Sequence, residues 1–309
     1  MRLLGALLLA VPLCAQVKIA QAPGRVTVEI DGKPYTEFFL APGGAKPYLY
    51  PLRTAAGIVV TRHYPMEKFP GETRDHPYHR GLYFSHGDIN GYDFWGNEPG
   101  QTGPRIGRME LKQVAEAQGG PRSGRIVAVF DGLDAQGKAM MTETRTIVFH
   151  ADPTLRMIDY EVSIEPRIRL TYGDTKEGTF AIRLATALSE DRTGRMVSAD
   201  GRETEKNVWG KRSPWVDYYG QVDGQTVGVA IFDHPSNPRH PTWWHARAYG
   251  LFAANIFGLH DFTGDKSQNA SLTLEPGGTL RFRYRVVIHP GDVKAANIAA
   301  LYREYAAGR

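Results

Sequence analysis

Histidines, arginines and aspartates are concentrated in one short segment, RDHPYHRGLYFSHGDINGYDFW at residues 74–95. Histidine exchanges a proton near neutral pH, and unpaired charges are costly to bury, so these groups must face solvent or form a satisfied network. The aromatic residues among them favour a functional site over a purely solvated loop. Within the segment we expect five residues to contact a ligand: His79, Arg80, Asp88, Asp93 and Trp95.

The apolar run at the centre of this segment has the pattern of an extended strand. Its even-numbered residues from Arg80 to His86 would share one face, and Tyr83 and Ser85 would share the other. Apolar residues on both faces predict an inner strand. About 23 Å would separate His79 from His86 along such a strand, so one metal ion cannot bind both. His86 is a candidate catalytic residue because histidine transfers protons near neutral pH.

A second block, GDTKEGTFAIRLA at residues 173–185, places charged residues in a glycine-bounded turn before a strand. Glu177 is a candidate general base, and Lys176 is suited to holding charge on a ligand oxygen. Arg183 follows on the strand, and we expect it to contact the ligand. The alternative is a solvated, ion-paired turn.

A third block, HPTWWHARAYG at residues 240–250, combines tryptophan with histidine and arginine. On a strand, Trp243, His245 and Arg247 share one face and Trp244 takes the other. This combination suits stacking on a sugar with contacts to hydroxyl or carboxylate groups. We expect Trp244 and Arg247 to contact the ligand, and His245 to be catalytic. The alternative is a tryptophan core with a hydrogen-bonded histidine.

Strand patterns dominate the whole chain. RVTVEIDGKPYTEFFL alternates apolar and polar residues about Asp31 and Gly32, a strong hairpin signal, and similar runs recur between short turns. Ile298, Leu301 and Tyr305 follow the spacing of one helical face near the C-terminus. The sequence predicts an all-β fold, a large antiparallel β-sandwich with a short C-terminal helix, formed by a single domain over residues 16–309.

The N-terminus has the pattern of a secretion signal over residues 1–15: a basic start, a short apolar run and a cleavage-like site before Gln16. The one cysteine, Cys14, would leave with it, so the mature chain would lack disulfides. We expect a periplasmic or secreted protein. No later apolar run is long enough to span a membrane. The net charge of +4 comes from scattered residues, which gives no nucleic-acid footprint.

Three blocks carry a resemblance to a known family: DHPYHRGLYFSHGDINGYDFW, YGDTKEGTFAIRLA and WWHARAYGLFAANIFG. They resemble a bacterial family of unknown function that carries the name methane oxygenase PmoA. A true particulate methane monooxygenase subunit spans the membrane several times, so that activity is not expected. HGDINGYDFW is also similar to the His-Gly-Gly, Gly-Phe and Trp pattern of galactose mutarotase-like sugar-binding sandwiches. That similarity implies the mutarotase-like architecture, and it implies that His86 touches a sugar ring.

Three classes of function fit these residues. The first is a secreted carbohydrate-active enzyme in which a histidine acid, His245 or His86, and Glu177 as base move protons on a sugar or uronate, in epimerisation, elimination or hydrolysis. The second is a metal-dependent enzyme in which His76, His79 and an acidic residue bind a divalent metal. The sequence does not identify the metal or any other cofactor. The third is a non-catalytic glycan-binding protein. A nucleotide-dependent oxidoreductase and a serine hydrolase are unlike this chain, because their glycine fingerprints are absent.

Overall fold

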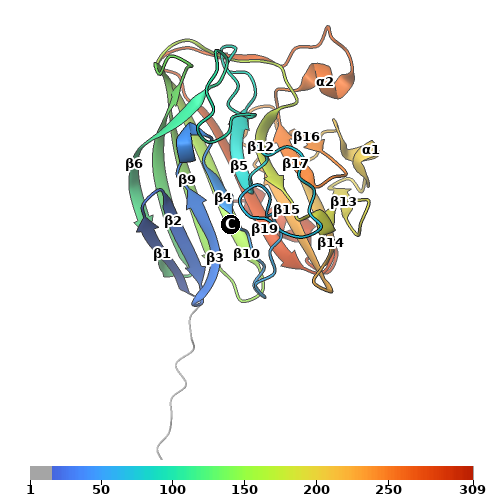
Figure 1. Ribbon diagram of the computed structural model, residues 1–309. Coiled ribbons are helices and arrows are strands. Elements are labelled where there is room, and N and C mark those ends of the chain that lie inside the picture. The colour runs from blue at the N-terminus through green and yellow to red at the C-terminus, as the bar shows by residue number, and fades with distance from the viewer. Residues whose placement is uncertain (1–15, 309) are drawn as a thin grey trace, which may run out of the picture.

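Antiparallel strands make up most of the regular structure in residues 16–308, the part of the chain that the computed structural model describes. Two large sheets lie one over the other (Figure 1). Side chains from the facing sides of both sheets form one large hydrophobic core. The predicted all-β sandwich is therefore confirmed. The expected signal segment, residues 1–15, lies outside the described residues.

The strands divide between the sheets as follows. The nine-stranded sheet has the order β16 (Trp243–Ala246), β17 (Leu251–Asn255), β12 (Gly178–Arg183), β5 (Leu82–His86), β4 (Tyr48–Tyr50), β3 (Lys33–Phe39), β2 (Arg25–Ile30), β1 (Gln16–Ala22), β7 (Gly120–Pro121). The eight-stranded sheet has the order β13 (Arg195–Ser198), β14 (Trp215–Val222), β15 (Gln225–Asp233), β19 (Leu280–Pro290), β10 (Arg156–Pro166), β9 (Ala139–Ala151), β8 (Ser123–Leu133), β6 (Arg108–Gln118). A small third sheet pairs β11 (Leu170–Tyr172) with β18 (Leu272–Leu274).

The helices are few and short. α3 (Ile298–Ala306) is the predicted C-terminal helix, and it buries Ile298 and Tyr305 against the eight-stranded sheet. Two helices not predicted from the sequence are α1 (Glu205–Val208) and α2 (Leu259–Thr263), both beside β16 and β17 in Figure 1. Single helical turns are too short to show a 3.6-residue period, so sequence patterning does not detect them. Across residues 16–308, no helix is long and apolar enough to cross a bilayer.

The predicted hairpin and inner strand are both present. β2 pairs with β3 around Asp31 and Gly32, whose φ angles of 54° and 72° match the positive values that a type I′ turn requires. β5 lies between β4 and β12, and all five of its residues are buried. β5 is thus the inner strand that the sequence predicts. The apolar run at residues 57–64 makes only isolated bridges, such as Thr61 to Leu184.

Candidate functional site

A row of side chains crosses the face of the nine-stranded sheet that points away from the eight-stranded sheet. Cross-strand pairing joins its members directly, and we call them the outer row: Tyr48, Tyr83, Ala181, Ala253 and His245. All five side chains are buried. The loops on this side of the sheet must therefore cover the row, and two of those loops carry the sequence blocks singled out above.

Aromatic rings cover the outer row at Tyr83. The ring of Trp95 packs on Tyr83 with a centroid separation of 5.0 Å, and the ring of His79 lies 6.5 Å from Tyr83. Tyr78 and Tyr249 pack on the same group and remain partly exposed. We call these five residues the outer cluster. Its buried members are thus separated from solvent by two tyrosines. Tyrosine is well suited to contact a ligand that has both a flat face and hydroxyl groups.

Four buried polar atoms around the outer cluster have no hydrogen-bond partner among residues 16–308: Tyr83 Oη, His79 Nε2, Trp95 Nε1 and Arg183 Nε. Arg183 Nη1 lies 3.4 Å from His79 Nδ1. Because arginine can only donate, His79 Nδ1 is the acceptor and the proton of the neutral ring is on Nε2. Three of the four atoms are therefore N–H donors. Buried polar atoms almost always have partners, so this group requires oxygen atoms from water or a ligand.

Asp75 neutralises the arginine beside this group. Its carboxylate accepts hydrogen bonds from Arg183 Nη2 and Arg62 Nη1, both at 2.9 Å, and those two arginine side chains have no exposed surface. Burial alone would raise the pKa of Asp75, but the hydrogen bond with His76 and the charges of Arg183 and Arg62 hold it below its usual value. Asp75 is thus the counter-ion that allows two guanidinium groups to be buried together.

His76 also contacts the Asp75 carboxylate, through its Nδ1 atom. Its ring is parallel to that of His79 at 4.8 Å and stacks on Tyr249 at 5.4 Å. The side chain is 37% exposed. An imidazole oriented by a carboxylate at Nδ1 can exchange a proton with a ligand through Nε2. Asp75 and His76 are therefore a candidate proton-transfer pair at the edge of the outer cluster.

Glu177 lies in the turn that leads into β12. Its carboxylate contacts Lys176 Nζ at 2.6 Å, and the two side chains are 32% and 38% exposed. The turn is held against the loop after β5, where the backbone N–H of Gly87 donates to the carbonyl of Glu177 at 2.7 Å. A Cβ atom at position 87 would come within 2.8 Å of the Glu177 Cβ. The glycine after His86 is therefore needed for this close approach.

The charges of both candidate acid–base groups reach Tyr249, as they also reach Tyr78. Burial raises the pKa of the Tyr249 hydroxyl to about 12, Arg247 and Arg183 oppose that rise, and Glu177 and Asp75 add to it. The Arg183 guanidinium also lies over the Tyr249 ring, 4.5 Å from its centroid. Two carboxylates from loops far apart in the sequence thus act on one partly exposed tyrosine.

His245 is the member of the outer row nearest to the Glu177 turn. Its Nδ1 atom lies 2.8 Å from the carbonyl oxygen of Lys176, so the ring donates there and fixes the residue before Glu177. Burial lowers the pKa of His245 to about 4, although Glu177 opposes that effect. The imidazole is neutral at pH 7, which corrects its expected role as an acid. His245 instead positions the turn.

Lys46 was not predicted from the sequence, because an isolated lysine between loop residues gives no signal. Its side chain is fully buried, and Nζ donates to the carbonyl oxygens of Trp95 and Asn97. Nζ also lies 5.3 Å from the centre of the Tyr83 ring. Burial lowers the pKa of Lys46 to about 7, and Asp93 partly opposes the shift. A buried amine that titrates near neutral pH therefore lies directly behind the outer cluster.

Two predicted site residues, His86 and Trp244, lie on the opposite side of the sheet. His86 shares its face of β5 with Leu82 and Phe84, which belong to the core between the sheets. Its Nε2 atom bonds the carbonyl of Gly173 at 2.9 Å, and burial lowers its pKa to about 4. Trp244 is also in that core, with no exposed surface. These positions correct the expectation that both residues touch a ligand.

The remaining predicted contacts support the loops of the site. Asp93 Oδ1 accepts bonds from the backbone N–H groups of Trp95 and Gly96, which fixes the tryptophan of the outer cluster. Asp88 accepts a bond from the N–H of Gly91 and so forms a turn. Arg247 forms an ion pair with Glu205 at 2.9 Å. Arg80 points instead to a neighbouring pocket, over β2 to β4, and its side chain is 12% exposed.

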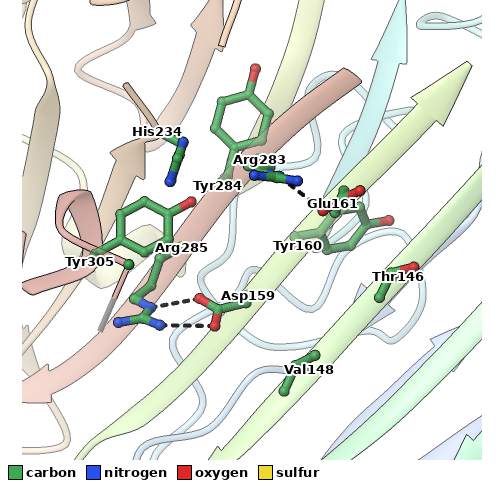
Figure 2. A pocket seen from close by; sticks show the side chains of 11 residues that line it. Thr146, Val148, Asp159, Tyr160, Glu161, His234, Arg283, Tyr284, Arg285 and Tyr305 are labelled. Atoms are coloured by element: carbon green, nitrogen blue, oxygen red, sulfur yellow. Dashed lines mark hydrogen bonds and ion pairs between the residues drawn. The ribbon is translucent and has the colours of Figure 1, made fainter. Parts of the chain in front are cut away.

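Another pocket, of about 270 Å³, lies on the exposed face of the eight-stranded sheet (Figure 2). Its charged groups are paired across strands: Arg285 binds both carboxylate oxygens of Asp159, and Arg283 binds Glu161 at 3.0 Å. Burial would raise the pKa of Asp159, but Arg285 and His150 lower it to about 2. This ladder of ion pairs explains the polar surface without a ligand. We therefore place the candidate site at the outer cluster.

The metal-binding alternative requires several histidine or acidic side chains close to one another. Within residues 16–308, no three histidine, cysteine, aspartate or glutamate side chains are grouped closely enough to hold a metal ion. His76 and His79, the histidines expected to bind it, stack with their ring planes 1° apart.

The chain belongs to a family of unknown function, DUF6807, whose model matches residues 25–303. The description of that family assigns no reaction and gives no support to the methane oxygenase name. No curated protein matches the chain.

Solved structures similar to the chain include a galactose mutarotase-like protein from Clostridium acetobutylicum, with 11% identity, a TM-score of 0.40, and coverage of 89% of this chain and 98% of that one. A galactose mutarotase-like protein from Lactobacillus casei has 8% identity, a TM-score of 0.39, and coverage of 88% and 100%. The α-galactosidase AgaA of Geobacillus stearothermophilus has 11% identity, a TM-score of 0.39 and coverage of 90% of this chain. The chain spans only 40% of that enzyme. What it binds must be inferred from its own side chains.

Proposed function

We propose that this protein is a carbohydrate-active enzyme whose sugar substrate lies over the outer cluster. The observation that carries the proposal is the group of three N–H donors and one tyrosine hydroxyl that are buried without partners among residues 16–308. A sugar presents many oxygen acceptors on a ring whose apolar face packs on aromatic side chains. Tyr78 and Tyr249, which separate the buried donors from solvent, provide such faces.

The chemistry proposed is proton transfer. Glu177 acts as the general base, and Lys176 at 2.6 Å orients its carboxylate. His76, oriented by Asp75, carries the second proton. This arrangement serves epimerisation, elimination or hydrolysis, which all need one group to take a proton and another to supply one. It replaces His86, which lies on the core side of β5, and His245, whose Nδ1 atom donates to the Lys176 carbonyl, as the expected acid.

A single assay tests this proposal. Neutral sugars and uronates are incubated with the protein in D₂O, and proton NMR follows anomeric or epimeric interconversion, elimination, hydrolysis and exchange at carbon. We expect turnover of at least one sugar, and we expect His76→Gln to reduce its rate by about 10²-fold or more.

His150→Gln is the matched control. It removes a histidine that also pairs with an aspartate, Asp159 at 2.7 Å, but on the eight-stranded sheet. Its turnover should equal that of the wild type. Binding without turnover would support the glycan-binding alternative, and equal losses in both histidine variants would remove His76 from the mechanism.

A further inference from the structure

A large pocket lies over β2, β3 and β4, on the same face of the nine-stranded sheet as the outer row. Its volume is about 710 Å³. Tyr48, a member of the outer row, lines this pocket and is the cross-strand neighbour of Tyr83. The pocket and the candidate site are therefore one strand apart. The acid–base chemistry proposed above makes no use of this space.

Aromatic side chains line the pocket. The rings of Phe39 and Tyr48 stack at 4.8 Å with an angle of 13° between their planes. Tyr50 lies beside them and donates its hydroxyl to Glu67 at 3.0 Å. Stacked, nearly parallel rings next to hydroxyl and carboxylate groups suit a ligand that has both a flat apolar face and hydroxyl groups.

The charges around these rings are of both signs. The pocket is lined by the arginines at 25, 53 and 80 and by the glutamates at 29, 37 and 67. An anionic chain would gain contacts with the arginines but would bring its own carboxylates against the glutamates. Neutral hydroxyl groups can donate to the glutamates and accept from the arginines. The balance of charge therefore favours an uncharged ligand.

One buried polar atom of a pocket residue is unsatisfied. Arg80 Nε has no hydrogen-bond partner within the described part of the chain. The same kind of unsatisfied atom is found around the outer cluster, so a requirement for ligand or water oxygens extends from one site to the other.

The two sites are joined by strand pairing. Phe39 pairs with Tyr48, and the outer row continues from Tyr48 to His245. Two strand spacings separate Phe39 from Tyr83 in the outer cluster, which is about 10 Å. That span exceeds the size of a single sugar ring, so a ligand in contact with both ends must contain more than one unit.

We propose that the substrate is an uncharged oligosaccharide: one unit lies at the outer cluster and the following units fill the pocket at Phe39 and Tyr48. This inference rests on the proposed function and specifies its substrate class. It predicts that affinity increases with chain length, and that the increase depends on residues of the pocket and not on those of the outer cluster.

The test is calorimetric titration of the full chain with neutral cello-, malto- and galacto-oligosaccharides of increasing length, starting from the monosaccharide, and with oligogalacturonides as charged counterparts. In one neutral series we expect the trisaccharide to bind about tenfold more tightly than the monosaccharide or better. Phe39→Ala should abolish that gain and leave affinity for the monosaccharide unchanged. Arg53→Gln, a milder change in the same pocket, should reduce the gain. Phe69→Ala is the control, because Phe69 is 52% exposed and lines a different pocket.

The outcomes separate this inference from the proposed function. Binding of monosaccharides with no gain in affinity for longer chains would overturn the inference and leave the function standing. A length-dependent gain that persists in folded Phe39→Ala and Arg53→Gln, or tighter binding of the charged series, would also overturn it. Failure of every sugar, of any length, to bind would reject both.

Discussion

Replacing Glu177 by glutamine should lower turnover of the sugar substrate by about 10²- to 10⁴-fold, the range for loss of a general base. The amide keeps the shape of the side chain but cannot accept the substrate proton at pH 7. The side chain is 32% exposed and is not part of a core, so the fold should persist. Substrate affinity should change little, because the loss falls on the chemical step.

Glu161→Gln is the matched control for this prediction. Glu161 has a similar exposure of 36% and pairs with a basic residue, Arg283, but lies on the other sheet in the pocket of Figure 2. Steady-state kinetics of both variants should show a loss in Glu177→Gln alone. If Glu161→Gln were the inactive variant, the reaction would belong to the eight-stranded sheet.

The largest effect on stability should follow from Asp75→Asn. The substitution removes the negative charge between Arg62 and Arg183, whose side chains have no exposed surface. Breaking a buried ion pair in this way costs about 3–5 kcal/mol. We expect about 3 kcal/mol, at the low end, because Asp75 is 36% exposed and water can partly replace it. Urea unfolding measures this difference.

The pH dependence of stability gives a second measure of the same residue. The folded state holds the pKa of Asp75 below its ordinary value. The carboxylate therefore contributes stability above its unfolded pKa, near pH 4, and that contribution is lost as the pH falls through the folded pKa. Asp75→Asn should lose less stability on acidification than the wild type.

Asp200→Asn is the control for the stability measurements. It removes half of an exposed ion pair with Arg202 and should change stability by less than about 1 kcal/mol.

The fold was more predictable than the site, because strand patterning is a local property. The alternation about Asp31 and Gly32 predicted the hairpin between β2 and β3, and the helical spacing near the C-terminus predicted α3. The same two-residue period correctly placed His86 with Leu82 and Phe84, and Trp244 opposite His245. Which of the two faces points to the core depends on how the sheets pack, and a strand that is apolar on both faces does not reveal it.

That ambiguity accounts for the errors in the expected site. His86 and Trp244 were chosen for their chemical types, but both point between the sheets. Tyr83, on the other face of β5, has no charged group to mark it in the sequence, although it lies at the centre of the outer cluster. Tyr249 and Lys46 reach the site from loops, and their approach depends on long-range packing. Glu177 and Lys176 were found because a charged turn before a strand is visible in the sequence.

The most direct test of a sugar site at the outer cluster is a crystal structure of the protein soaked with a neutral oligosaccharide that it binds. We expect electron density for a sugar ring against Tyr249 and Tyr78, with sugar oxygens within hydrogen-bond distance of His79 Nε2 or Tyr83 Oη and with Glu177 beside the ring. Density at the Asp159 and Arg285 pocket of the opposite sheet, with the outer cluster unchanged, would contradict it.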